Sequence, residues 1–348
     1  MTKRTLRRIN WQEAAVALSA RLPLKQLHPA VLSWIDDCPS RKKWVVGFSG
    51  GADSLALLLL LWAHWPRRRT RLQALHFNHR LRGRESKADE VFCRGVCDAL
   101  GVEFISGSWR AAPQKPSEAE ARAARHDFFQ QHSRTLWLGH QQDDVAETML
   151  MRLARGSGTG GLAAPRPVHT LSGGRVHLRP LLSLKKTEIT TALKSLRLPW
   201  REDSSNSGAA YFRNRLRHTV VPAWIEASQR DALAGASRAR ELLEEDEVAL
   251  EAWVVELRLF AKKGRMSLIP LAGKPRALVR RALHSWLSRQ TRSGELSRQG
   301  FGALLDAVQR GKPTRQSLGS EGFAVIRDEV LSFVFDGKPR RKFHGSTN

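Results

Sequence analysis

The sequence predicts an α/β fold, in which a domain built on a parallel sheet is followed by a mostly helical C-terminal domain with a little β structure. Two observations support this prediction. In the first half of the chain, short apolar runs typical of buried strands alternate with longer segments of helical pattern. In the second half, helical patterns dominate up to a last pair of short apolar runs. The 348 residues are enough for two or three domains.

Several runs have the length and composition of buried strands, and segments of helical pattern lie between them. The predicted strands are 44–49, 72–78, 102–108 and 135–140, and the predicted helices are 50–66, 86–100 and 117–132. This alternation predicts parallel strands, and ligands of such sheets bind at the carboxyl ends of the strands. The stretches SGGADS, HFNHR and GHQQDD all fall at these ends, so we expect a site there.

A second region begins near His218. The residues after it predict one or two long helices, with Pro222 near the start and Gly264 at the end. Two further helices and a hairpin that turns at Asp328-Glu329 are expected at 276–290, 297–311 and 323–335. The predicted organisation is an N-terminal helical extension, a sheet domain, a helical domain and a basic tail, at 1–40, 41–217, 218–337 and 338–348.

The charge balance predicts a polyanionic partner. The chain has 58 Lys and Arg against 33 Asp and Glu, which gives a formal net charge of +25. Nucleic acid is the first partner that such an excess indicates, an anionic membrane surface is the second, and a generally basic surface without a partner is the alternative.

The cysteines and the apolar runs indicate a cytoplasmic protein. An odd, sparse set of three cysteines gives no disulfide framework. Cys93 and Cys97 have no second pair, which favours two buried thiols on one helix face over an iron–sulfur or zinc site. No apolar signal core follows the basic N-terminus, and the run 55–65 is too short to span a bilayer.

The stretch from Ser49 to Ser54 joins a strand to a helix through two glycines. Backbone N–H groups at such a helix N-terminus bind anions. The stretch lacks the lysine of a Walker loop and the third glycine of the dinucleotide fingerprint. Asp53 would repel a bare polyphosphate, so a Mg²⁺ ion between them would explain it. An ordinary first-turn acid of the helix is the alternative.

This glycine turn resembles the PP-loop of the N-type ATP pyrophosphatases, which cleave ATP between the α and β phosphates. Further segments resemble, in order, the tRNA(Ile)-lysidine synthetase family: 76–93, 118–129, 139–165, 179–182 and 200–218. The resemblance implies a Rossmann-like PP-loop ATPase domain that binds ATP through Ser49, Gly50, Gly51, Ala52, Asp53 and Ser54. The helical region resembles the family's substrate-binding domain more weakly, and we expect the farther C-terminal domain of longer members to be absent.

The stretch GHQQDDVAET places His140, Asp144 and Glu147 at helical spacing, so they share one face if a helix starts near His140. Such a group could hold magnesium, an amine or a polarised base, and a solvated acidic first turn is the alternative. The resemblance implies that these residues and Asp53 form the catalytic centre. Gln141 stands where the family often has a second histidine.

Seven arginines are candidate contacts for tRNA phosphates: Arg122, Arg125, Arg152, Arg155, Arg213, Arg215 and Arg217. Each group has a simpler interpretation. Arg122 could form a surface ion pair with Glu118, the glycine-rich loop after Arg155 could be a flexible linker, and the last three could be a solvated helix face. The resemblance favours contact with RNA.

The resemblance also implies a reaction. ATP, with Mg²⁺, adenylates the C2 oxygen of the wobble cytidine in the CAU anticodon of isoleucine tRNA, and the amine of free L-lysine then displaces AMP to give lysidine. Two alternatives stay open: another PP-loop tRNA-modifying enzyme that carries out 2-thiolation, and a non-catalytic RNA-binding protein with a vestigial ATP site. Thiolation enzymes with iron–sulfur centres need paired Cys-x-x-Cys motifs, which this sequence lacks.

Overall fold

The computed structural model describes residues 9–39, 42–80, 83–109, 117–202, 212–261, 264–290, 296–319 and 322–335. It divides into two compact units, Met1–Glu244 (unit 1) and Glu245–Asn348 (unit 2). The domain boundary that we expect at residue 218 stays a prediction, and the expected tail at 338–348 lies outside the described residues. None of the described helices is both long and apolar enough to cross a membrane.

Unit 1 is built on a six-stranded sheet with the order β3-β2-β1-β4-β6-β5. Its strands are β1 (Trp44–Gly47), β2 (Leu72–Asn78), β3 (Glu103–Ser108), β4 (Thr135–Trp137), β5 (Val168–Leu171) and β6 (Arg175–Leu178). All neighbours are parallel except β5, which is antiparallel to β6. The predicted α/β class is confirmed, whereas the β5–β6 hairpin was not predicted.

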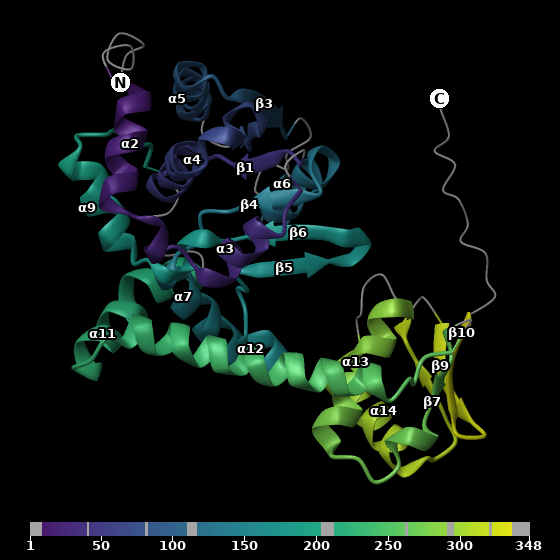
Figure 1. Cartoon of the computed structure of the whole chain (residues 1–348). Helices are drawn as coiled ribbons and strands as arrows, with labels where there is room; N and C mark the ends of the chain where they lie inside the picture. Colours follow the sequence, from purple (N-terminus) through teal and green to yellow (C-terminus); the bar gives the residue numbers. More distant parts are fainter. Residues whose placement is uncertain are drawn as a thin grey trace, which may run out of the picture. The chain divides into compact units, whose positions relative to one another are not determined.

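Four helices cover one face of this sheet: α2 (Trp11–Arg21), α4 (Ala52–His64), α5 (Arg84–Leu100) and α9 (Lys186–Ser195) (Figure 1). Successive residues of β1 point to opposite faces, as in any strand. Trp44 and Val46 belong to the core under these helices, and Val45 belongs to a smaller core with Phe129 of α6 (Glu118–His132). Both faces are therefore buried, which explains why β1 reads as a continuous apolar run.

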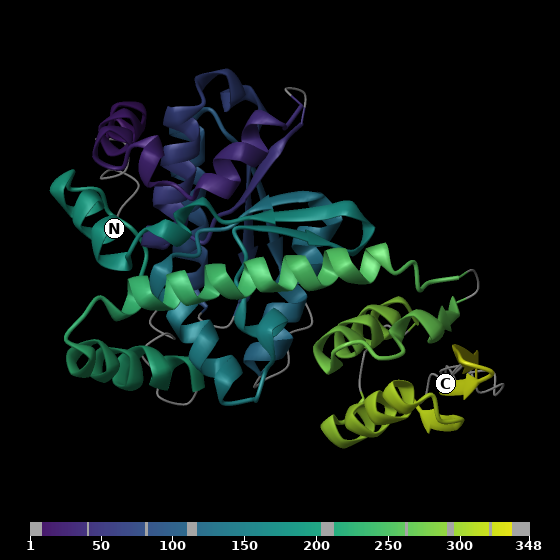
Figure 2. The same ribbon diagram turned by 60° about the horizontal axis from the view of Figure 1, so that its bottom comes forward.

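Of the remaining helices of unit 1, the first precedes β1 in the chain and the others come after β4. They are α3 (Pro29–Asp36), α7 (Gln142–Leu153), α8 (Thr159–Leu162), α10 (Phe212–Arg215), a π-helical turn (Leu216–Val220) and α11 (Val221–Ser228). Short 3₁₀ helices lie at Leu24–Gln26, Pro66–Arg71, Ser172–Gly174 and Pro180–Ser183. The long helix α12 (Ala232–Glu256) is continuous through the division between the units (Figure 2).

Unit 2 combines the end of α12 and two further described helices with an antiparallel sheet of order β7-β10-β9-β8. Its elements are β7 (Met266–Ser267), a 3₁₀ helix (Ile269–Leu271), α13 (Arg276–Gln290), α14 (Arg298–Arg310), β8 (Thr314–Ser317), β9 (Gly322–Arg327) and β10 (Val330–Phe335). The predicted hairpin is confirmed, and its turn residues Asp328 and Glu329 both have positive φ. Strands β7 and β8 extend it to four strands.

Candidate active site

The predicted nucleotide-binding turn lies between β1 and α4. Gly50 has a φ of +86°, which a side chain rarely allows, and a Cβ there would lie 3.0 Å from the Cys93 sulfur. The hydroxyl groups of Ser49 and Ser54 bond to each other at 3.0 Å, and the Ser54 hydroxyl also donates to the carbonyl of Gly51 at 3.1 Å. These two serines, which are predicted to bind ATP, thus also hold the turn together.

A distant segment fixes the same turn. The backbone N–H of Arg201 donates to the Gly50 carbonyl at 2.9 Å, and its Nε donates to Oδ1 of Asp89 at 2.6 Å. Asp89 is buried in α5, so this ion pair joins α5 to the chain after α9, next to the turn. Neither residue was among the predicted site residues.

The end of β4 lies directly against the start of α4. A Cβ at Gly139 would lie 2.9 Å from both the carbonyl carbon and the carbonyl oxygen of Asp53. Helix α7 then begins with a capping box, in which the Gln141 side chain accepts from Asp143 N at 2.6 Å and Asp144 Oδ2 accepts from Gln141 N at 3.0 Å. Gln141, at the position of the family's second histidine, is therefore the N-cap of α7.

Asp53 lies in the first turn of α4 with its carboxylate largely withdrawn from water. Its Oδ1 is buried and has no hydrogen-bond partner among the described residues. The pKa of Asp53 is raised to about 6, mainly by burial; Lys186 opposes the rise and Asp144 contributes to it. An unpartnered buried carboxylate oxygen beside an anion-binding turn fits a Mg²⁺ site.

The acids of α7 meet two arginines from the segment that begins at α10. Nε of Arg213 lies 2.7 Å from Oε2 of Glu147, and its Nη2 lies 2.6 Å from Oδ1 of Asp144. Arg217 binds both oxygens of Glu147, at 2.6 and 3.0 Å. The carboxyl groups of Asp144 and Glu147 are buried, so the ion pairs compensate charge that would otherwise be costly. The sequence did not predict these pairs.

His140 lies between the end of β4 and the N-cap of α7. Its Nδ1 lies 3.0 Å from Nε of Arg179, which follows β6. Burial lowers the pKa of His140 well below its usual value, and the cations Arg179, Arg213, Arg122 and Arg125 lower it further. The imidazole is therefore neutral at physiological pH.

The other predicted arginines lie on α6, α7 and the following turn, and on α10. Arg122 and Arg125 lie on α6, near enough to His140 to affect its pKa. The Arg152 side chain donates to the carbonyl of Gly161 in α8, and Arg155 is exposed just after α7. Arg215 lies over the Phe212 ring, 5.8 Å from its centroid. The structure thus brings Arg122, Arg125, Arg213 and Arg217 to the site.

The cysteines do not contribute to this site as ligands. Cys38, Cys93 and Cys97 are free and buried, and Cys93 and Cys97 lie in α5 as predicted. Burial raises the pKa of the Cys97 thiol and that of the Cys93 thiol well above their usual range. No group of histidine, cysteine and acidic side chains among the described residues is arranged to hold a metal ion by itself.

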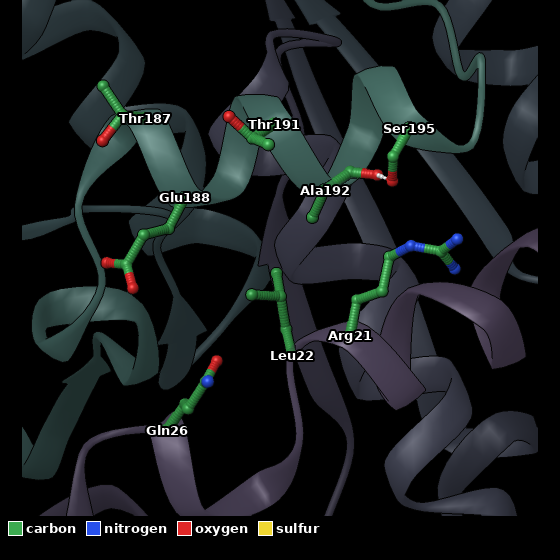
Figure 3. A pocket seen from close by; sticks show the side chains of 8 residues that line it. All are labelled: Arg21, Leu22, Gln26, Thr187, Glu188, Thr191, Ala192 and Ser195. Atoms are coloured by element: carbon green, nitrogen blue, oxygen red, sulfur yellow. Dashed lines mark hydrogen bonds between the residues drawn. The ribbon is translucent and has the colours of Figure 1, made fainter.

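A hollow elsewhere on unit 1 carries none of the predicted site residues. It lies between the end of α2 and the following 3₁₀ helix on one side and α9 on the other, with Gln26 and Glu188 reaching toward each other (Figure 3). Its lining side chains belong to Arg21, Leu22, Gln26, Thr187, Glu188, Thr191, Ala192 and Ser195.

Sequence reasoning missed Asp89, Arg179, Lys186 and Arg201 of the site. Arg179 and Arg201 stand in the stretches RPLL and WRED, which carry part of the family resemblance. Nothing in their spacing connects them to His140 or to Gly50, because the partners are far apart in the sequence.

Comparison with known proteins gives a consistent result. The model of the PP-loop domain family matches residues 24–224. A tRNA(Ile)-lysidine synthase of Geobacter sulfurreducens is 36% identical over 285 residues, covering 76% of this chain and 58% of the relative. One of Pseudomonas syringae pv. tomato is also 36% identical over 285 residues, covering 78% and 63%. The chain spans about six tenths of the length of these curated relatives.

Among solved structures, the U34-tRNA thiolase NcsA from Methanococcus maripaludis with its [4Fe-4S] cluster aligns with a TM-score of 0.49 and 18% sequence identity. The alignment covers 67% of this chain and 78% of that one.

Proposed function

Because the chain belongs to the PP-loop domain family, we propose that it ligates L-lysine to C2 of the wobble cytidine in the CAU anticodon of isoleucine tRNA. The family assignment supports the use of ATP. In the proposed reaction the C2 oxygen attacks the α-phosphorus of ATP and pyrophosphate leaves. The lysine amine then attacks C2, AMP leaves, and lysidine forms.

The observation that supports this proposal best is the state of Asp53. Its buried Oδ1 has no partner among the described residues, and it lies at the N-terminus of α4, where backbone N–H groups attract phosphate. We infer that Asp53 holds Mg²⁺ beside the triphosphate. When bound there, Mg²⁺ would make the α-phosphorus more electrophilic, which a weak nucleophile such as a pyrimidine oxygen requires.

The acids of α7 are suited to recognise a cationic substrate. Asp144 and Glu147 already bind the guanidinium groups of two arginines at hydrogen-bond distance. A lysine ammonium group has the same charge and the same kind of donors. We propose that one of these carboxylates binds lysine and helps to release the neutral amine, in exchange for contacts with an arginine.

The tRNA is the proposed polyanionic partner. The formal net charge of +25 suits a phosphate backbone, and Arg122 and Arg125 add positive charge near His140. We propose that the wobble cytidine leaves its stack to reach the site, and that the reaction takes place in the cytoplasm, without a membrane. No observation in this structure favours 2-thiolation or a vestigial ATP site.

The test is an omission series. Purified protein receives ATP, Mg²⁺, radiolabelled L-lysine and an isoleucine tRNA transcript with a CAU anticodon, and each component is left out in turn. We expect pyrophosphate release that needs the transcript, and label in RNA that needs all four components. A transcript with uridine in place of the wobble cytidine is the matched control. Label that enters both transcripts equally, or never enters RNA, would overturn the proposal.

A further inference from the structure

The side chain of Arg179 is held rigidly beside the site. It is 7% exposed, its backbone N–H donates to the carbonyl of Pro167 at 2.8 Å, and its Nη1 donates to the carbonyl of Arg166 at 2.7 Å. The third bond runs from Nε to Nδ1 of His140 at 3.0 Å. Among the described residues, no acidic side chain forms an ion pair with this guanidinium. The guanidinium thus bonds to one backbone carbonyl and one histidine ring, and the backbone N–H of Arg179 bonds to a second carbonyl.

This arrangement determines where the proton of His140 lies. A guanidinium nitrogen donates hydrogen bonds and never accepts one, so Nδ1 of His140 must accept. The ring is neutral, because burial and four neighbouring arginines disfavour its charged form. A neutral imidazole with an accepting Nδ1 carries its proton on Nε2. Nε2 then has a proton to donate and no free lone pair with which to accept one.

We infer that Arg179 is a positioning residue that holds His140 in the Nε2–H form, so that His140 donates a hydrogen bond to an anionic oxygen of the nucleotide and does not act as a general base. This inference deepens the proposed function and rests on it for the identity of the oxygen, which belongs to a phosphate group. A neutral imidazole that stabilises developing negative charge is a known catalytic device.

The surroundings of His140 support an oxyanion as the ligand. His140 follows Gly139, which lies against the Asp53 peptide at the start of α4, and it precedes the N-cap of α7. Two helix N-termini therefore meet near the ring, and both add partial positive charge. The arginines that lower its pKa add full positive charge. This positive charge disfavours an imidazole that takes up a proton. It favours an imidazole whose N–H donates to an anion, because the neighbouring groups attract the same anion.

The first test measures the tautomer directly, without substrates. The protein is labelled with ¹⁵N-histidine, and the two ring nitrogens of His140 are assigned by comparison with the His140→Gln variant. At pH 7.5 we expect one protonated nitrogen, Nε2, and one unprotonated nitrogen, Nδ1. A proton on Nδ1, or on both nitrogens, overturns the inference whatever reaction the protein catalyses. This result also stands if the proposed ligation fails.

The second test separates a donor from a base. A glutamine amide can place an N–H near the position of Nε2, whereas an asparagine amide reaches only to the position of Nδ1. We expect His140→Asn to lower kcat by about 10² to 10³-fold, as the loss of one oxyanion donor does, and His140→Gln by only about tenfold. Equal losses in the two variants would contradict a donor role.

The third test concerns Arg179 itself. In Arg179→Met the His140 ring loses its donor, so we expect both neutral tautomers in the spectrum, a lower kcat and an almost unchanged KM for ATP. Arg179→Lys keeps a charged donor and should restore part of kcat. A folded Arg179→Met protein with an unchanged tautomer would overturn the positioning role. If that variant does not fold, the spectrum of the unsubstituted protein still decides the inference.

Discussion

Unit 1 and unit 2 both have a large apolar core, but they differ in what else they bury. Among the described residues, unit 1 buries carboxylates, guanidinium groups and imidazoles, including Asp89, Asp144, Glu147, His177, Arg179 and Arg240, whereas the buried polar residue of unit 2 is Glu247, beside Arg281. A buried charge is unfavourable unless a partner compensates it. The number of buried polar side chains, more than the size of the apolar core, therefore distinguishes the unit that carries the predicted catalytic residues.

The same contrast holds for histidine. Burial lowers the pKa of several histidines in unit 1: His28, His64, His76, His126, His140, His169 and His177. In the described part of unit 2 the corresponding residue is His284. Unit 1 therefore has more buried neutral histidines whose protonation at low pH would favour unfolding.

The largest effect is expected at Asp53. Asp53→Asn should reduce pyrophosphate release by at least roughly 10³-fold, since a bound metal ion contributes several kcal/mol to such a reaction. The same variant should unfold at the same or a higher urea concentration, because it removes a negative charge that burial disfavours and whose Oδ1 has no hydrogen-bond partner among the described residues. Affinity for tRNA should be nearly unchanged in a filter-binding measurement. If Asp53→Asn lost stability together with activity, the result would indicate a structural role for Asp53 and contradict the metal-binding role.

Glu147 should affect stability as well as activity. Glu147→Gln leaves Arg213 and Arg217 without their main counter-charge, and both guanidinium groups are mostly buried. We expect a loss of about 2–4 kcal/mol in the free energy of unfolding, somewhat below the usual figure for a fully buried pair. The matched control in unit 2 is Glu251→Gln, because Glu251 is 47% exposed in its pair with Arg281. It should change stability by no more than about 0.5 kcal/mol.

Acid should destabilise unit 1 before unit 2. Burial, aided by Arg240 and Arg179 respectively, lowers the pKa of His28 to about 4 and that of His177 to about 3, from 6.5. Below pH 6.5 the unfolded chain therefore binds protons that the folded chain does not. The stability from these groups is complete above pH 6.5 and is lost progressively as the pH falls from 6.5 to about 3.

Thiol labelling in urea measures this difference. All three cysteines are buried in unit 1, so their labelling reports its unfolding. An Ala282→Cys variant supplies a buried probe in unit 2, and mass spectrometry of peptides separates the two signals. We expect the midpoint of unit 1 to fall more than that of unit 2 between pH 7.5 and pH 5. Equal shifts would show that the buried histidines do not control acid stability.

Sequence reasoning reached the elements of the fold more readily than the contacts of the site. Local pattern was enough for β2, α13 and the hairpin around Asp328, because apolar period and turn residues act over a few positions. It failed for β5 and β6, whose alternation is interrupted by polar residues such as His169 and Arg175. The β5–β6 hairpin depends on the pairing of β6 with β4, a contact between distant segments that local pattern does not indicate.

The site divides in the same way. The glycine turn and the spacing of His140, Asp144 and Glu147 are local patterns, and the sequence indicated them. The pairing of Arg213 with Asp144 and of Arg179 with His140 joins residues 69 and 39 positions apart. Such pairs depend on how the parallel strands are ordered, and no local rule specifies that order. Arg213 and Arg217, which the sequence offered either as RNA contacts or as part of a solvated helix face, compensate the buried acids of α7.

The smallest effect is expected at Gly139, where the chain after β4 contacts the start of α4. Gly139→Ala places a Cβ 2.9 Å from two backbone atoms of Asp53, neither of which can rotate away. We expect a loss of about 1–3 kcal/mol in stability, as for other overpacked sites. Because the displaced atoms belong to Asp53, kcat should fall as well.

The control is Gly235→Ala in α12, where a Cβ meets nothing within 4 Å. That change should stabilise unit 1 by about 0.5–1 kcal/mol, because alanine favours a helix. Urea unfolding and pyrophosphate release on the same preparations measure both quantities. If Gly139→Ala behaved like Gly235→Ala, the contact between β4 and α4 would not limit the reaction, and the buried polar groups of unit 1 would tolerate more movement than their geometry implies.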